Sequence, residues 1–101
     1  MKIVEFKNEK GQTEFYLVGA ETWEDFDTLV SILKENVEAQ PIDVVDGPDV
    51  RLCSIDHHGI PITLTYYDGL GNYLSSPDMR LESVKQVRSL AHAILKSFCG
   101  A

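Results

Sequence analysis

The sequence has few basic residues and few cysteines, and both shortages restrict the kinds of protein that it can encode. Nine lysines and arginines stand against 16 aspartates and glutamates, so the formal net charge is −7. A chain this acidic lacks the positive surface that binds a phosphate backbone, and no nucleic-acid partner is expected. Because no secretory signal accompanies the two cysteines, Cys53 and Cys99, we expect free thiols rather than a disulfide.

Long apolar runs and phosphate-binding loops are also missing. No apolar run approaches the roughly 20 residues that cross a membrane, and the polar segment after Met1 has no apolar signal region. We therefore expect a cytoplasmic protein with no membrane partner. Gly69 and Gly71 are interpreted as turn glycines, because no strand-loop-helix unit and no lysine follow them at phosphate-loop spacing. No cofactor is expected.

The overall amino-acid composition is typical of one globular domain. Of the 101 residues, 44% are hydrophobic and 25% are charged, and no linker rich in proline, glycine or serine divides the chain. We expect a single domain over residues 1–101 that folds around one core.

Alternating apolar residues predict a hairpin over residues 1–20. A two-residue turn at Lys10-Gly11 opposes Phe6 to Phe15 and Val4 to Leu17. This register predicts that these four side chains face the core.

A second hairpin is predicted over residues 50–67, with its turn at His58-Gly59. The register then opposes Ile55 to Ile62, Cys53 to Leu64 and Arg51 to Tyr66. One face therefore collects the apolar residues Cys53, Ile55, Ile60, Ile62 and Leu64. Residues 42–49 read as a short extended piece and a turn, and Asn72 to Ser75 could add a short strand.

Two amphipathic helices are predicted. The first begins at Thr22, where Thr22 and Asp25 approximate a capping box, and ends before Pro41. Its apolar stripe, which is expected in the core, consists of Trp23, Phe26, Leu29, Val30, Leu33 and Val37. The last helix is expected to start at Ser76-Pro77-Asp78 and to end at Gly100.

These elements follow one another in the order ββαββ(β)α. The pattern predicts an α+β fold, a two-layer sandwich in which an antiparallel sheet of four or five strands carries both helices on one face.

One cluster of residues has side chains that could bind a metal or act as nucleophile and base: Cys53, Asp56, His57 and His58. Alternation along a strand sends His57 and His58 to opposite faces, so three ligands cannot easily converge. The register also places Cys53 in the apolar layer, where a thiolate is disfavoured. We expect neither a metal site nor catalysis there.

Acidic residues are concentrated in the middle of the chain. Residues 21–50 carry nine acids and one base, Lys34, a formal sum of −8. Such charge keeps a small protein soluble, and it also steers association with a basic partner. The partner-binding residues that we expect are six acids and two tyrosines: Glu24, Asp27, Glu35, Asp43, Asp46, Asp49, Tyr67 and Tyr73.

One stretch resembles a group of short uncharacterised bacterial proteins. It runs from Asp46-Gly47-Pro48-Asp49-Val50-Arg51, through the Gly59 turn and Ile62-Thr63-Leu64-Thr65-Tyr66-Tyr67-Asp68, to Gly71-Asn72, and the resemblance covers residues 46–78. In size, acidity and mixed α/β build, the whole chain is similar to bacterial immunity proteins, including those of contact-dependent growth inhibition. Such proteins neutralise a cognate toxin by covering its active site, so the resemblance implies a non-catalytic protein that binds a basic toxin domain.

Two alternatives to a protein-binding domain stay open. A small enzyme or ligand-binding domain could use the sheet face around Ser54, Thr63, Thr65 and His57, which would require a concave pocket there. A homodimer could instead form through exposed strand edges or a helix face.

Overall fold

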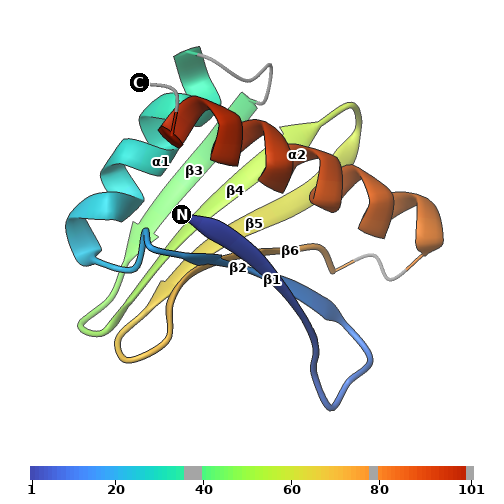
Figure 1. Ribbon diagram of the computed structural model, residues 1–101, viewed down its shortest axis with the longest axis horizontal. Helices are drawn as coiled ribbons and strands as arrows, with labels where there is room; N and C mark the ends of the chain where they lie inside the picture. The colour runs from blue at the N-terminus through green and yellow to red at the C-terminus, as the bar shows by residue number, and fades with distance from the viewer. Residues whose placement is uncertain (36–39, 78–79, 100–101) are drawn as a thin grey trace.

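The computed structural model describes residues 1–35, 40–77 and 80–99, and within these ranges six strands form one antiparallel sheet with two helices (Figure 1). The elements are β1 (Lys2–Lys7), β2 (Thr13–Val18), α1 (Trp23–Glu35), β3 (Gln40–Asp46), β4 (Val50–His57), β5 (Ile60–Tyr67), β6 (Gly71–Ser75) and α2 (Leu81–Cys99). Across the sheet the strands lie in the order β1-β2-β6-β5-β4-β3. The predicted α+β class is confirmed, but the predicted four or five strands become six because residues 40–46 form a complete edge strand.

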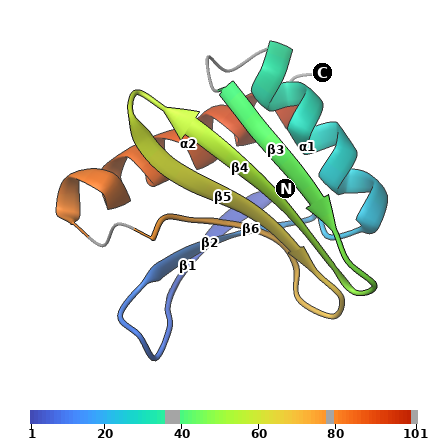
Figure 2. The ribbon, with the colours of Figure 1, turned by 180° about the vertical axis from the view of Figure 1, so that it is seen from behind.

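Both helices pack against the same face of the sheet. In Figure 1, α2 crosses in front of the strands and α1 lies beside β3, and the view from behind shows β3, β4 and β5 in front of α2 (Figure 2). The core between the layers is formed by side chains that are almost completely buried: Phe15, Leu17, Phe26, Leu29, Leu33, Ile55, Ile62, Leu64, Leu74, Val87, Leu90 and Ile94. In the described ranges, neither helix combines the length and apolar content needed to cross a bilayer.

The first hairpin has a register that differs by one residue from the predicted one. The structure pairs Val4 with Tyr16 and Phe6 with Glu14, not with Leu17 and Phe15. The cause is the Asn8 side chain, whose Oδ1 accepts hydrogen bonds from the backbone N–H groups of Lys10 and Gln12 at 3.0 Å each and so builds a longer turn. Because side chains alternate between faces, this slip moves Val4 and Phe6 out of the predicted core.

The second hairpin has the predicted register. Ile55 lies opposite Ile62, Cys53 opposite Leu64 and Arg51 opposite Tyr66. Its turn places His58 at φ 54° and Gly59 at φ 80°, the left-handed pair that matches the twist of a two-residue hairpin.

The first helix begins with the predicted capping box. Asp25 N–H donates to Thr22 Oγ1 at 3.0 Å, and Thr22 N–H donates to Asp25 Oδ2 at 3.1 Å. Trp23, in contrast, was wrongly expected in the core: it lies at the edge of the apolar layer with 36% of its surface exposed. Val37 lies outside the described residues.

The last helix is described from Leu81 onward. The Ser76 hydroxyl, at the expected helix start, donates to the Pro61 carbonyl at 2.6 Å. The expected positions Asp78 and Gly100 lie outside the described residues.

Candidate functional site

Arg51 neutralises two of the acids that we expected at a partner interface. Its Nη2 lies 2.9 Å from Asp27 Oδ1 of α1, and its Nε lies 2.8 Å from Asp46 Oδ1 of β3. The guanidinium is buried, contacts the rings of Trp23 and Phe26 at 4.5 and 4.4 Å, and also donates to the Trp23 carbonyl at 3.1 Å. Hydrogen bonding to Arg51 lowers the pKa of Asp27. The bonds from Arg51 to Asp27 and to the Trp23 carbonyl therefore fasten α1 to the sheet, and the pair with Asp46 joins β4 to β3.

The other predicted acids remain exposed. In the part of the chain that the structure describes, no ion pair involves Glu24, Glu35, Asp43 or Asp49. They do not gather in one place, because Glu35 lies at the opposite end of α1 from Glu24 and Asp43 lies on the edge strand β3. The predicted acidic surface is thus divided among several regions.

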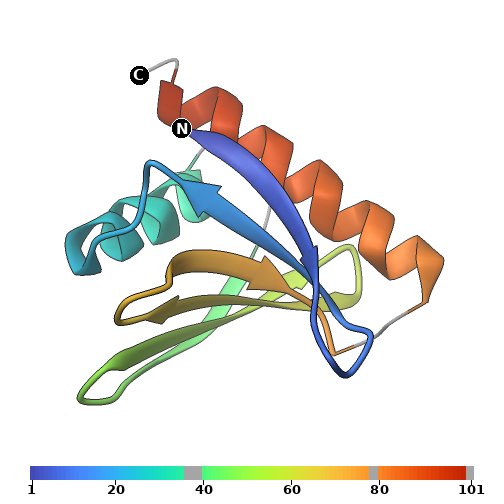
Figure 3. The same ribbon diagram turned by 60° about the horizontal axis from the view of Figure 1, so that its bottom comes forward.

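One of these regions, the acidic end, comprises Glu24, Asp49 and Asp68. The start of α1 and the β3–β4 and β5–β6 turns lie at the same end of the molecule (Figure 3). The two turns are joined by a hydrogen bond from Asp68 N–H to the Asp49 carbonyl at 3.0 Å. Burial and the charges of Asp68, Glu24 and Asp49 raise the pKa of Tyr66. Trp23 packs edge-on against the Tyr66 ring at 5.7 Å.

Cys53 and His57 lie on β4, and His58 follows in the turn. Cys53 is a buried free thiol in the layer beneath the helices, and burial raises its pKa. His57 alternates with Cys53 and Ile55 on the same helix-covered face, and burial lowers its pKa. The His57 and His58 rings touch at 4.3 Å, yet the described residues include no group of three His, Cys, Asp or Glu side chains that could hold a metal ion.

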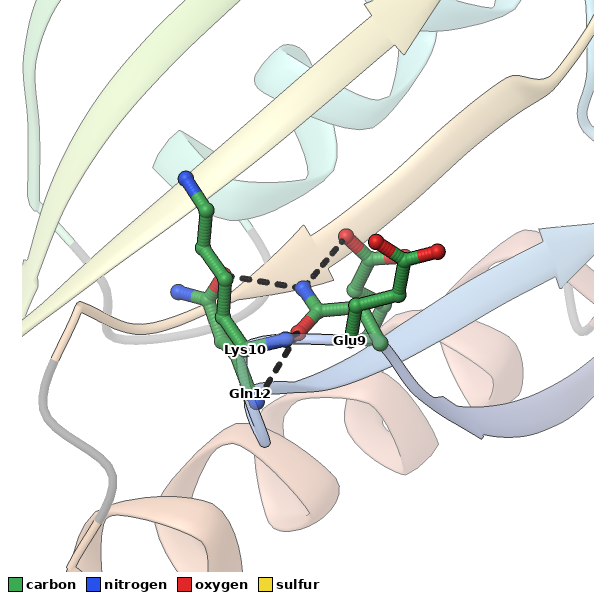
Figure 4. Close-up of a pocket in the computed structure, with 5 residues that line it drawn as sticks. Glu9, Lys10 and Gln12 are labelled. Atoms are coloured by element: carbon green, nitrogen blue, oxygen red, sulfur yellow. Dashed lines mark hydrogen bonds between the residues drawn. The ribbon is translucent and has the colours of Figure 1, made fainter.

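A shallow hollow of about 390 Å³ lies at the β1–β2 turn (Figure 4). Its lining is polar and consists of Asn8, Glu9, Lys10, Gln12 and Glu14. The polar groups bond to one another, since Asn8 Nδ2 donates to Gln12 Oε1 and Glu14 Oε2 at 3.3 Å each. This hollow is the surface of a turn whose shape its own side chains determine.

The sheet face opposite the helices carries a row of side chains that crosses all six strands, and we call it the open face. Successive pairings place one residue of each strand in this row, from β1 to β3: Val4, Tyr16, Tyr73, Thr65, Leu52 and Val45. Tyr67 and Phe6 lie on the same face and are 48% and 56% exposed. Ser54 and Thr63 also lie there, whereas His57 points into the helix-covered side. The structure thus separates the residues of the alternative enzymatic or ligand-binding site.

Two tyrosines form the centre of the open face. The Tyr16 and Tyr73 rings lie 4.9 Å apart at 32°, and the Tyr16 hydroxyl donates to Glu14 Oε1 at 2.9 Å. Burial and the hydrogen bond to Glu14 raise the pKa of Tyr16 to about 12, and burial raises the pKa of Tyr73. Thr65 is only 6% exposed although no helix covers it, so neighbouring side chains lie over it. These tyrosines form a firm, largely apolar platform.

Comparison with protein-family models, with curated proteins and with solved structures finds no match for this chain.

Sequence reasoning identified part of the open face and missed the rest. Tyr67, Tyr73 and Asp43 were predicted partner-binding residues and lie on it. Tyr16 and Glu14 were missed because the predicted first-hairpin register made them the solvent side of an isolated pair of strands. The signal that could have found them is Asn8 before Gly11, which is typical of a longer turn and a shifted register.

Proposed function

We propose that this chain is a non-catalytic protein-binding domain whose partner is a basic protein, as in immunity proteins that neutralise a toxin domain. The observation that carries the proposal is the open face, a complete sheet face with aromatic and aliphatic side chains that no described element covers. Uncovered apolar patches of this kind mark interaction sites more often than unused surface. Three acids on this face, Glu14, Asp43 and Asp56, favour a partner of opposite charge.

Two features favour binding over catalysis. The Cys53 thiol is buried and its pKa is raised, which keeps it in the unreactive protonated form. His57, the residue best suited to act as a base near neutral pH, lies on the other side of the sheet from the hydroxyls of Ser54 and Thr63.

The proposal is tested by capture followed by kinetics. The immobilised chain is used to capture proteins from the native lysate, and each captured protein is identified, purified and tested for direct binding. We expect a basic partner whose association slows about tenfold at low salt with the variant Asp43→Lys/Asp49→Lys. The matched control, Glu9→Lys/Glu82→Lys, changes the net charge equally at two other exposed acids and should have a smaller effect.

Two results would overturn the proposal. One is a partner that is acidic, and the other is an association rate that both charge reversals change equally. The immunity form further requires that the partner stops growth when expressed alone and that coexpression of this chain restores growth. A partner that is harmless alone would refute that form.

A further inference from the structure

We propose that the open face is the docking surface itself and that arginine side chains of the partner lie on its Tyr16–Tyr73 centre. This inference rests on the proposed function, because it assumes a basic protein partner. It adds the location of the contact and the chemistry that recognises the partner.

The centre of the open face combines the two groups that a guanidinium prefers. Aromatic faces attract cations, and a carboxylate accepts two parallel hydrogen bonds from arginine. Here the half-buried rings of Tyr16 and Tyr73 lie next to the Glu14 carboxylate. Hydrogen bonds from Tyr16 and Asn8 already hold that carboxylate in place, which lowers the entropy that binding must overcome.

The charges around the platform select a basic occupant. Glu14, Asp43 and Asp56 lie on the open face, and the lysine among the described residues of this face is Lys2 at the far end of β1. The exposed lysines of α2, Lys85 and Lys96, lie on the helix side of the molecule, where Arg88 is half-buried and paired with Glu5. The helix side also carries the acids of α1, so the preference for a basic occupant rests on the three acids of the open face itself.

The same charges disfavour a second copy as the occupant. A two-fold dimer through the open face would place Glu14, Asp43 and Asp56 of one copy against the same acids of the other. Strand addition at the β3 edge is also disfavoured, because Pro41 lacks an N–H group and the register shifts between Pro41 and Asp43.

The apolar side chains supply the affinity that charge alone does not. Leu52, Val45 and Val4 are 37%, 54% and 42% exposed and flank the tyrosines in the same row. Tyr67 lies one row away and next to Asp68 of the acidic end. Aromatic and aliphatic contacts of this kind hold a complex after charge has speeded its encounter.

The experiment uses the full isotope-labelled chain and a synthetic peptide in which arginine alternates with leucine. We expect NMR shifts of Tyr16, Tyr73, Thr65 and Leu52 on titration, and no shifts with a peptide in which glutamate replaces arginine. Glu14→Gln removes the charge but keeps an acceptor for Tyr16, and it should weaken binding about tenfold. Its matched control, Glu35→Gln on α1, should bind like the wild type.

A second pair of variants separates apolar contact from charge. Tyr67→Ser should weaken binding, whereas Leu81→Ser, which removes an exposed apolar side chain from α2, should not. Unfolding midpoints measured for each pair show that the variants remain folded.

Other results of these experiments would overturn the location of the contact, the identity of the occupant or the proposed function. Shifts confined to Glu24, Asp49 and Asp68 would overturn the docking surface but leave a basic partner in place. A concentration-dependent dimer by light scattering that Tyr67→Ser abolishes would identify a second copy as the occupant and overturn this inference. Absence of binding by the arginine peptide, together with an acidic captured partner, would refute the proposed function as well.

Discussion

Replacement of Arg51 by alanine should destabilise the protein by about 3 kcal/mol. The side chain makes two ion pairs, one hydrogen bond to the Trp23 carbonyl and two ring contacts. The carboxylates of Asp27 and Asp46 are 66% and 48% exposed, so water can replace the arginine and each pair contributes only about 0.5 kcal/mol. The two ring contacts contribute about 0.5 to 1 kcal/mol each, and the carbonyl bond adds about the same.

The assay is urea unfolding followed by circular dichroism, with the slope m checked for constancy. Arg51→Met keeps an unbranched apolar side chain between the two rings and should therefore lose only about half as much stability as Arg51→Ala. The control is Arg88→Ala, since Arg88 bonds to both oxygens of Glu5, at 2.6 and 3.1 Å, but is only half-buried. An Arg51→Ala variant no less stable than Arg88→Ala would refute the assignment of Arg51 as the link between α1 and the sheet.

The same contact has a pH signature. The pKa of Asp27 is lowered from its ordinary 3.8 in the folded state, so the unfolded chain binds the proton more tightly. The stabilisation is complete above pH 3.8 and is lost as pH falls through the lower folded value. In Arg51→Ala this part of the acid dependence should disappear.

Three further predictions concern folding. His57 is buried with a pKa below the ordinary 6.5, so stability should decline as pH falls below 6.5, and His57→Leu should flatten this decline in urea titrations at several pH values while His92→Gln should not. Thr22→Ala removes the hydroxyl of the capping box and should lower the free energy of unfolding by about 1 kcal/mol, measured by thermal unfolding. His58→Asn should raise stability by about 0.5 kcal/mol, measured by urea unfolding, because asparagine adopts positive φ more readily than histidine.

Each of these predictions has an outcome that contradicts it. Equal pH profiles for His57→Leu and the wild type would show that burial does not perturb the histidine. An unchanged melting temperature for Thr22→Ala would mean that the cap adds nothing to helix α1. A less stable His58→Asn would point to a larger role for the contact between the rings of His57 and His58, which lie 4.3 Å apart.

Local signals predicted the elements whose determinants are close together in the chain. The second hairpin was found in its correct register because the turn is local: Gly59 after His58 favours a two-residue turn, and both residues adopt positive φ. The start of α1 was found because Thr22 and Asp25 satisfy each other's backbone N–H groups. The spacing of apolar residues likewise predicted the α+β class, because it follows one period in strands and another in helices.

Tertiary structure decided what the local signals left open. Residues 40–46 became a sixth strand because β4 offered them an edge to pair with, and Asn8 moved the first hairpin by one residue. Arg51 forms ion pairs with Asp27 and Asp46, which in the sequence are indistinguishable from acids such as Asp43 and Asp49 that have no ion pair among the described residues. The sequence by itself determined the alternation of faces within each strand, whereas the packing of the two helices on one side decided which face became core and which became the open face. The physical reason is that alternation is a property of neighbouring residues, but burial depends on elements that come together from distant parts of the chain.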